Sequence, residues 1–435
     1  MTDHVAVLAD RLADRRAVVA VIGLGYIGLP IAAAMVDAGF RVLGLDTDPA
    51  KRAALATGAS GPAHLGGDLP RRLLDRGRYE VCEDDGRLAE ADAVLVCVPT
   101  PLDAEQQPDL SAVEDAARAV AAVQRPGQLV VLESTTWPGT TREVLLPILE
   151  ADGLRCGHDL FVAFAPERED PGRTDMASTA IPRLVGGLDA ASGALAVALY
   201  EAALDTVVPV SSAEVAEAAK LLENVYRAVN IALVNELKRV LVALDVDVHE
   251  VIDAASTKPF GFQPFRPGPG LGGHCLPIDP FYLAWRARQV GEPTHFVELA
   301  GAVNHAMPGW VVERTCGALQ ADGIPLDGAR VLVIGLAYKA DVDDVRESPS
   351  FALVADFQAR GARVEVHDPH VARARAPGSA LELVSVPLTA ERLAGSDVVV
   401  VATDHAAVDW PAVAKHARLV VDTRAVLRGL GGRVI

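Results

Sequence analysis

The stretch VIGLGYIG, from Val21 to Gly28, decides the fold of this chain. It places Gly23, Gly25 and Gly28 in a G-x-G-x-x-G spacing between a β-branched run and an Ala-rich run. In this pattern the first glycine permits a tight turn, the second lets a pyrophosphate approach the backbone, and the third lets helix and strand pack closely. The free N–H groups at the start of the helix bind the anion. The stretch therefore predicts a strand, a turn and a helix that bind a dinucleotide.

An acidic residue follows at the expected distance. The segment RVLGLDTD predicts a second strand that ends at Asp46, 18 residues after Gly28. A carboxylate there accepts hydrogen bonds from the adenosine ribose and favours NAD over NADP. Strand-like runs at 92–101 and 129–139 end in hydroxyl, Pro and Gly residues, which is typical of strand ends around a cofactor crevice. The alternative is a glycine-rich turn that serves only packing.

The uncharged run from Ala17 to Val36 also has the length of a membrane span or a signal peptide. Its three glycines and Pro30 interrupt it, however, and favour a buried strand followed by a buried helix.

The C-terminal third repeats the same pattern. The segments 329–341, 362–370 and 396–405 resemble the first, second and third strand regions of the N-terminal part. We therefore expect a second parallel αβ unit. Its glycine signature is incomplete, because only Gly335 remains, so it should not bind a dinucleotide in the same way. Lys339 and Arg346 follow its first strand and are candidates to hold the phosphates of another nucleotide, or are surface charges.

Composition limits the class of protein. The chain has 435 residues, 50% of them hydrophobic, so two or three domains are expected. Its net charge of −18 gives no general attraction for nucleic acid or for an anionic membrane. The five cysteines are odd in number, scattered and without a CxxC pair, so they predict neither a disulfide framework nor a metal site. A cytoplasmic location fits this cysteine usage.

A long helix is predicted from Ser211 to Leu244, a range without Gly or Pro. Ser211 and Glu214 suit a capping box, and apolar residues recur every three to four positions. We expect this helix to be largely buried and to form the centre of a homodimer or a higher homo-oligomer.

Lys220, Asn224 and Arg227 share one face of this helix. Burying a lysine and an asparagine without partners is costly, so a functional role is favoured. The alternative is a solvated stripe in which Glu217 and Glu223 are the partners. A lone cysteine, Cys275, lies in the glycine- and proline-rich loop GPGLGGHCLPIDP, residues 268–280.

Together these stretches resemble the UDP-glucose/GDP-mannose dehydrogenase family over about residues 15–430. The resemblance rests on seven motifs in order: VIGLGYIGLP, VPTPLD, ESTTWPGTT, APERxxPG, KLLENVYRAVNIALVNEL, GPGLGGHCLPIDP and GLAYKADVDDVRESP. The wording STKPFGFQPFRPGPGLGGHCLPIDPFYL is closest to the UDP-N-acetylglucosamine 6-dehydrogenase branch. Glu169 and Asp170 depart from the family pattern after APER, which leaves the sugar open.

The resemblance implies a four-electron oxidation of the C6 alcohol of a UDP-sugar to a uronate, in two hydride transfers to NAD. Cys275 adds to the intermediate aldehyde and carries it to a thioester that water cleaves. Such uronates serve polysaccharide biosynthesis. The alternatives are the same chemistry on UDP-glucose or dTDP-glucose, and a two-electron β-hydroxy-acid-type dehydrogenase, which shares the K-x-x-x-N helix. A sensor without catalysis is a third alternative, disfavoured because Cys275, Lys220 and Asn224 are all present.

The resemblance also assigns site residues by position. The catalytic ones are Cys275, Lys220, Asn224, Asp279, Glu167 and Thr135. The NAD-binding ones are Gly23, Gly25, Tyr26, Ile27, Gly28, Asp46, Lys51, Thr100, Thr135 and Arg346. The substrate-binding ones are Arg168, Lys220, Asn224, Arg227, Gly272, Tyr338 and Lys339.

The expected fold is α/β, with two Rossmann-like doubly wound parallel-sheet domains joined by a long central helix and a helical dimerisation region. The predicted domains are an NAD-binding domain at 1–205, a central helical domain with the cysteine loop at 206–320, and a nucleotide-sugar-binding domain at 321–435.

Overall fold

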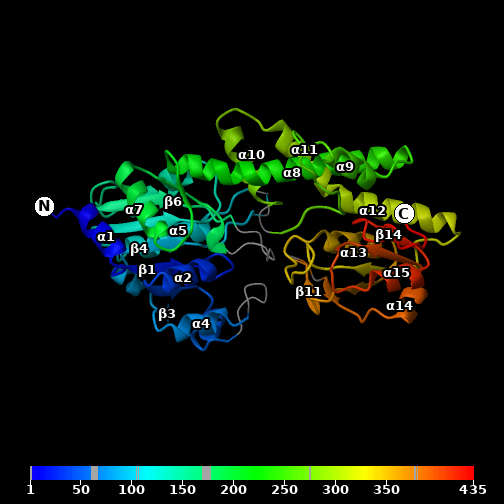
Figure 1. Cartoon of the computed structure of the whole chain (residues 1–435), viewed down its shortest axis with the longest axis horizontal. Helices are drawn as coiled ribbons and strands as arrows, with labels where there is room; N and C mark the ends of the chain where they lie inside the picture. The colour runs from blue at the N-terminus through cyan, green and yellow to red at the C-terminus, as the bar shows by residue number, and fades with distance from the viewer. Residues whose placement is uncertain are drawn as a thin grey trace. The chain divides into compact units, whose positions relative to one another are not determined.

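The computed structural model describes residues 2–59, 67–103, 105, 107–168, 178–273, 276–376, 379 and 381–435. The chain divides into two compact units (Figure 1). The first unit comprises Met1–Glu223 and Phe281–Glu292, and the second comprises Asn224–Pro280 and Pro293–Ile435.

The first unit contains an eight-stranded sheet in the order β3-β2-β1-β4-β5-β6-β7-β8. Neighbouring strands are parallel except for β6 and β7. The strands are β1 (Val18–Ile22), β2 (Arg41–Leu45), β3 (Tyr79–Cys82), β4 (Ala93–Val96), β5 (Gln128–Leu132), β6 (Leu160–Phe164), β7 (Arg183–Gly187) and β8 (Val207–Pro209). The helices include α1 (His4–Ala13), α2 (Gly28–Asp37), α3 (Pro49–Ala56), α4 (Leu69–Asp75), α5 (Ser111–Ala121), α6 (Leu146–Leu149) and α7 (Ala190–Glu201). Short helical turns are η2 (Asp85–Glu90), η3 (Thr141–Leu145) and η4 (Ser178–Ala180).

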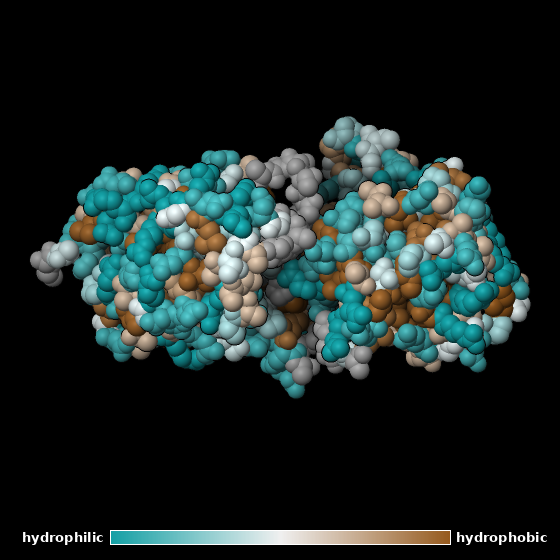
Figure 2. All heavy atoms as spheres, turned by 90° about the horizontal axis from the view of Figure 1, so that it is seen from below, coloured by the Kyte–Doolittle hydropathy of each residue, from teal (hydrophilic) through white to brown (hydrophobic). Residues whose placement is uncertain are grey.

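The uncharged run at 17–36 forms strand β1 and helix α2, separated by the glycine turn. The membrane-span and signal-peptide alternatives for this run are therefore wrong, because its residues belong to the core of the first unit. Among the described residues, no helix is both long enough and apolar enough to cross a membrane. Hydrophilic side chains cover most of the face drawn in Figure 2.

The second unit contains a parallel four-stranded sheet in the order β10-β9-β13-β14. Its strands are β9 (Arg330–Ile334), β10 (Arg363–His367), β13 (Val398–Val401) and β14 (Val420–Asp422), with a separate antiparallel pair, β11 (Arg373–Arg375) and β12 (Glu382–Val384). The helices that cover the sheet are α12 (Met307–Ala321), α13 (Pro349–Ala359), α14 (Ala390–Gly395) and α15 (Trp410–His416).

Alternate residues of β9 serve two separate cores. Val331 and Val333 pack with α12 and α13, whereas Leu332 and Ile334 pack with α14 and α15. A strand that is apolar on both faces is typical of a parallel sheet covered by helices on both sides. The predicted second αβ unit is thus present, and both sheets have the doubly wound arrangement that the sequence predicts.

Helix α8 (Ala213–Ala243) begins in the first unit and ends in the second. It is followed by α9 (Val248–Ser256), α10 (Asp279–Gln289) and α11 (His295–His305). The predicted cap is off by one residue, because the hydroxyl of Ser212, not of Ser211, accepts the N–H of Val215 at 3.4 Å.

The expectation that α8 is largely buried is wrong in this chain. An apolar stripe along the helix is exposed, comprising Leu222, Tyr226, Leu233, Leu237 and Val240. The opposite side supplies buried residues such as Leu221, Ala228 and Val234. The helix is therefore apolar on two sides, of which the fold of one chain covers only one.

Candidate functional site

The glycine turn after β1 has the close contacts that its spacing predicts. Gly23 has a φ of +94°, in the region that favours glycine, and a Cβ there would lie 2.6 Å from the carbonyl oxygen of Cys97. A Cβ on Gly28 would lie 1.8 Å from the carbonyl oxygen of Gly23, so only glycine allows α2 to begin so close to the strand. A Cβ on Gly25 would meet no atom within 4 Å. The backbone at Gly25 is thus open to a ligand.

Asp46 follows β2 and faces this turn. Its Oδ2 accepts the N–H of Leu24 at 2.9 Å and the ammonium of Lys51 at 2.8 Å, and its Oδ1 accepts the N–H of Asp48 at 3.0 Å. Burial acts to raise the pKa of Asp46, but the hydrogen bonds from Lys51 and from the N–H groups of Asp48 and Leu24 outweigh it and lower the pKa. Asp46 is therefore a carboxylate at neutral pH, with room left on Oδ1 for a further donor.

These residues fit a bound NAD. The open backbone at Gly25 and the start of α2 at Gly28, where no side chain caps the N–H groups, suit the pyrophosphate. The Asp46 carboxylate suits the adenosine ribose. Thr100 is buried after β4, and Tyr26 and Ile27 lie in the turn itself. All of these predicted NAD-binding residues belong to the first unit.

Glu167 lies in a buried ionic network after β6. The guanidinium of Arg183 donates to Glu167 Oε2 at 2.6 Å and to Glu133 Oε2 at 3.2 Å, and the hydroxyl of Tyr200 donates to Glu133 at 2.6 Å. The other oxygen of Glu167 accepts the N–H of Arg168 at 2.6 Å. Burial raises the pKa of Glu133 to about 7, although Arg183 opposes the shift. The sequence assigned no role to Arg183, the partner of Glu167, or to Tyr200 and Glu133, although Glu133 is the first residue of the ESTTWPGTT motif.

Lys220 is buried in the first unit, with 7% of its surface exposed. Its ammonium forms no hydrogen bond or ion pair with any residue that the structure describes. The two acids of α8 that were expected to pair with Lys220 have other partners. Glu217 is fully buried and accepts the N–H groups of Gly139 and Thr141, and Glu223 pairs with Arg168 at 2.5 Å. The solvated-stripe alternative therefore does not hold for Lys220.

Asn224 and Asp279 form a second buried pair, within the second unit. The side-chain amide of Asn224 donates to Asp279 Oδ2 at 2.5 Å, and each residue is less than 10% exposed. Arg227, one turn further along α8, is exposed. In the first unit, the predicted Thr135 is half-buried after β5, and Arg168 also donates to the carbonyl of Pro182 at 2.8 Å.

The described part of the cysteine loop packs against the loop after β9. A Cβ on Gly272 would lie 2.5 Å from Cβ of Tyr338, and one on Gly273 would lie 2.9 Å from the Tyr338 ring. The N–H of Gly273 donates to the carbonyl of Arg346 at 2.9 Å. The contact with Tyr338 is why two successive glycines are required here. Cys275 itself lies outside the described residues, as do Glu169 and Asp170.

The loop after β9 also carries cationic groups. Arg346 donates to both carboxylate oxygens of Asp344, the shortest contact being 2.6 Å, and Lys339 is half-buried. The sequence analysis missed Arg424, which follows β14. Its Nε donates to the carbonyl of Ala402 at 2.8 Å, and a Cβ on Gly268 would lie 2.6 Å from its Nη1. Arg424 therefore places a guanidinium against the first glycine of the cysteine loop.

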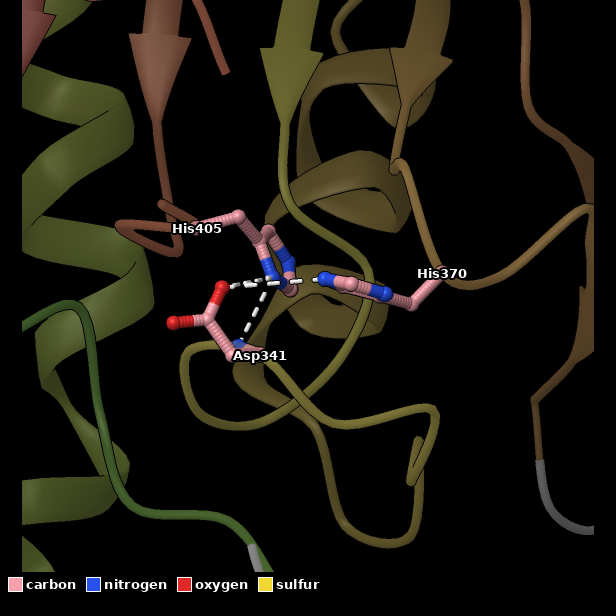
Figure 3. Close-up of side chains that lie close together, drawn as sticks. All are labelled: Asp341, His370 and His405. Carbon is pink, nitrogen blue, oxygen red and sulfur yellow. Dashed lines mark hydrogen bonds and ion pairs between the residues drawn. The ribbon is translucent and has the colours of Figure 1, made fainter. Parts of the chain in front are cut away.

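Three potential metal ligands lie together in the second unit, and Figure 3 shows them pointing toward one another: Asp341, His370 and His405. Both ring nitrogens of His405 are already engaged, since Nδ1 accepts the N–H of Asp341 at 3.0 Å and Nε2 is 3.0 Å from Asp368 Oδ2. The lone pair of Nδ1 cannot bind a cation while it accepts this hydrogen bond. Two exposed ligands remain, too few for the coordination that protein metal sites show. We therefore interpret this cluster as structural.

Models of three domains of one family match the chain in order. They are described as the UDP-glucose/GDP-mannose dehydrogenase family NAD binding domain at residues 17–204, central domain at 214–306 and UDP binding domain at 332–429. The chain belongs to the UDP-glucose/GDP-mannose dehydrogenase family. The resemblance seen in the sequence is thereby confirmed, and the chain is an NAD-dependent nucleotide-sugar dehydrogenase. The predicted boundaries at 205/206 and 320/321 remain a prediction.

Named relatives agree with this membership. UDP-N-acetyl-D-mannosamine dehydrogenase of Pyrococcus horikoshii is 36% identical over 94% of this chain and 96% of its own length. UDP-N-acetyl-D-glucosamine 6-dehydrogenase of Pseudomonas aeruginosa is 34% identical over 81% of this chain and 83% of its own length. The solved structure of UDP-D-ManNAc dehydrogenase from Pyrococcus horikoshii has a TM-score of 0.87 at 33% identity and covers 96% of this chain and 99% of that one.

A UDP-glucose dehydrogenase structure from Pyrobaculum islandicum is also similar. It has a TM-score of 0.84 at 28% identity, with 96% of each chain covered. The two-domain fold is thus shared by relatives named for acetylated and for plain sugars, so the fold does not select the sugar.

Proposed function

We propose that this dehydrogenase oxidises C6 of a UDP-N-acetylhexosamine to the carboxylate in two successive steps, with Cys275 as the nucleophile. The observation that carries the proposal is the buried Lys220, whose ammonium has no partner among the described residues. A lysine held in the interior with no partner for its ammonium among the described residues is explained best by a substrate oxygen that carries charge during the reaction.

In the first step, Lys220 stabilises the C6 oxygen as its proton leaves, and Asn224 holds that oxygen by hydrogen bonding. Bound NAD supplies the hydride acceptor, one molecule for each of the two oxidations. The hydrogen bond from Asn224 to Asp279 fixes the amide, so that its second N–H is directed by the protein rather than by solvent. The product of this step is an aldehyde.

In the second step, the Cys275 thiolate attacks the aldehyde carbon. A C–S bond forms and the oxygen takes a proton, which gives a thiohemiacetal. Loss of the second hydride leaves a thioester, and water then breaks the C–S bond to release the carboxylate and the thiol. Glu167 is proposed to position this water together with Thr135, and the ion pair with Arg183 holds Glu167 in place.

The nucleotide half of the substrate is assigned to the second unit. Tyr338 and Lys339 lie on the loop after β9, and Arg424 lies beside the described part of the cysteine loop, where cationic side chains suit phosphate oxygens. Arg346 stays a predicted NAD contact. Gly272 is proposed to bring the backbone close to the substrate, and Arg168 and Arg227 to contact it.

The test of the two-step reaction is the ratio of NADH formed to sugar consumed. We expect two NADH per sugar and a carboxylate identified by mass spectrometry. Cys275→Ala should reduce acid formation by on the order of 10³-fold or more, since no thioester can form. Cys316→Ala, which removes a half-buried thiol from α12, is the matched control and should leave the rate unchanged. A ratio of one NADH per sugar would instead favour the β-hydroxy-acid type of reaction.

The sugar is proposed from the loop wording and from the relatives named for N-acetylated sugars. A panel of UDP-N-acetylglucosamine, UDP-N-acetylgalactosamine, UDP-N-acetylmannosamine, UDP-glucose, dTDP-glucose and GDP-mannose decides it. A site that pairs the acetamido group should reject a sugar without it by several kcal/mol, on the order of 10⁴ in kcat/KM. A preference of more than about tenfold for UDP-glucose or dTDP-glucose would overturn the sugar assignment alone.

The assembly is proposed to be at least a dimer, formed through the exposed apolar stripe of α8. Exposed apolar side chains in such a continuous row mark an interaction surface. The loop at 257–266 of a neighbouring copy is proposed to contribute residues to the site that contains Cys275. Light scattering should show a dimer or larger at micromolar concentration. Leu233→Asp with Leu237→Asp should dissociate it, whereas Arg239→Ala, an exposed change on the same helix, should not. A wild-type monomer would exclude the proposal. The cytoplasmic location stays a prediction.

A further inference from the structure

A cavity of about 540 Å³ lies within the second unit, between the end of α8, the start of α9, helix α12 and the segment that follows β14. Apolar side chains form part of its wall, among them Val248, Val311 and Leu427. Of the residues proposed above for catalysis, NAD binding or substrate binding, none that the structure describes lines it. The proposed reaction therefore assigns it no role.

Two cationic side chains of the lining form no ion pair with a carboxylate among the described residues. Lys238 is only 8% exposed, and its ammonium contacts the carbonyl oxygen of Thr423 at 3.4 Å. Arg314 forms no ion pair with any residue in the described part of the chain. Both cationic groups lie 5.9 Å from the centroid of the Trp310 ring, where each has a favourable cation–π contact. Burial lowers the pKa of Lys238 to about 8, and burial lowers the pKa of Arg314 as well.

The lining also contains a buried nitrogen without a hydrogen-bond partner in the described part of the chain. His249 is 6% exposed, and its Nε2 is buried without a hydrogen-bond partner among the described residues. A buried polar nitrogen without a partner is uncommon and costs free energy. His249 belongs to the lining, and no described residue competes for this nitrogen.

The described acids of the lining form no ion pair with Lys238 or Arg314, although Asp422 and Asp247 favour the charged form of Lys238 from a distance. Asp422 accepts the N–H groups of Arg424 and Leu427, at 3.0 and 2.8 Å. Asp247 accepts the N–H of His249 at 2.8 Å and pairs with Arg428 at 3.3 Å. Asp245, the remaining acid, is exposed. The cavity therefore brings two cationic side chains that lack an ion-pair partner among the described residues next to an apolar wall.

We infer that this cavity binds a small organic anion, in which a phosphate or carboxylate group contacts Lys238, Arg314 and His249 and an apolar or ring-shaped body contacts the aliphatic wall. An oxyanion satisfies two cations and a neutral imidazole N–H at once. The volume exceeds that of a bare phosphate ion, and the apolar lining makes burial of a hydrocarbon body favourable. The described residues that line the cavity are different from those proposed to bind the substrate.

Calorimetric titration of the full-length enzyme tests the inference, with phenyl phosphate, benzoate and inorganic phosphate as probes. UDP is kept at saturating concentration so that the substrate site is filled. We expect phenyl phosphate or benzoate to bind at least tenfold more tightly than inorganic phosphate, and the better of the two identifies the anionic group. Arg314→Gln and Lys238→Met should each weaken that binding at least tenfold.

Arg363→Gln is the matched control, because it removes one positive charge from an exposed position of the same unit outside the cavity. Binding that is weakened equally by this control would overturn the inference, since it would reflect net charge alone. So would the absence of binding of all three probes at millimolar concentration, or undiminished binding to the folded Arg314→Gln protein. Circular dichroism melting of each variant distinguishes lost binding from lost structure.

Discussion

The two αβ units begin with the same turn and use it differently. Gly23 and Gly335 occupy the same place after β1 and β9, and their N–H groups donate to the equivalent carbonyls of Leu45 and His367, at 2.8 and 2.7 Å. After this point they diverge. Helix α2 begins at Gly28, five residues after Gly23, whereas α13 begins at Pro349, after a long loop. The first turn exposes a helix start, and the second presents a loop with side chains.

The acids after the second strands differ in the same sense. Asp46 and Asp368 are equivalent, and each accepts an N–H from the glycine turn of its own unit, from Leu24 and from Leu336. Asp368 also accepts the N–H groups of Ala337, His370 and Val371 and lies 3.0 Å from His405 Nε2, so both of its oxygens are saturated. Asp46 retains acceptor capacity on Oδ1. One acid is therefore available to a ribose, and the other holds its own loop together.

The largest expected effect comes from making the first turn resemble the second. The position of Gly25 in the first turn corresponds to Ala337 in the second turn. Gly25→Ala should leave thermal stability unchanged, because a Cβ there meets no protein atom within 4 Å. It should raise the KM for NAD about 100-fold, which corresponds to about 3 kcal/mol of lost contact with the pyrophosphate. Steady-state kinetics and calorimetric melting measure the two effects.

Gly28→Ala is the contrasting variant for the same turn. Its Cβ would clash with the carbonyl of Gly23, so we expect a loss of about 1–3 kcal/mol of unfolding free energy together with weaker NAD binding. Equal melting temperatures for the two variants would contradict the distinction between an open and a closely packed glycine.

The next effect concerns the two acids. Asp46→Asn should reduce the preference for NAD over NADP by about tenfold, because the repulsion of a 2′-phosphate by a carboxylate is removed. Asp368→Asn should leave the cofactor preference unchanged and lower stability by about 1–3 kcal/mol, since it disturbs a buried and saturated acceptor. Kinetics with both cofactors and denaturant unfolding check these outcomes. A change in NADP use in the Asp368 variant would break the comparison.

The smallest effect is in the pH dependence of stability. A rise in pH changes the free energy of unfolding in opposite directions through a buried acid of each unit. Burial acts to raise the pKa of Asp368, but hydrogen bonds from His405 and from the N–H groups of Ala337 and Leu336 lower it to about 2, so its contribution is present above pH 4 and is lost as pH falls toward 2. Burial raises the pKa of Glu133 to about 7, so its contribution to stability declines as pH rises from about 4.5 to 7.

Glu133→Gln should therefore flatten the loss of stability between about pH 4.5 and 7, and Asp368→Asn should flatten the acid limb between about pH 4 and 2. Urea unfolding across this pH range measures both slopes. Unchanged slopes in both variants would show that other groups control the pH dependence.

The turn glycines, the strand runs and Asp46 could be predicted because their meaning is local. A G-x-G-x-x-G spacing followed by an acid describes contacts within about 25 residues of chain, and the contacts of Gly23, Gly28 and Asp46 follow it. The Ser211 cap was wrong by one residue, because two hydroxyls, of Ser211 and Ser212, precede α8 and only the backbone decides which of them accepts. The burial of α8 was wrong because apolar periodicity does not say whether its own chain covers it.

By itself the sequence determined the order of strands and helices, the glycine turn, the acid that follows it and the repeat in the second unit, since all of these are properties of neighbouring residues. Only the tertiary structure decided that Arg183 meets Glu133 and Glu167, that Gly272 is glycine because Tyr338 lies against it, and that Lys238, Arg314 and His249 share one cavity. These groups lie far apart in the chain. Whether a charge or a hydrogen-bond donor has a partner is decided only when folding brings such groups together and removes water.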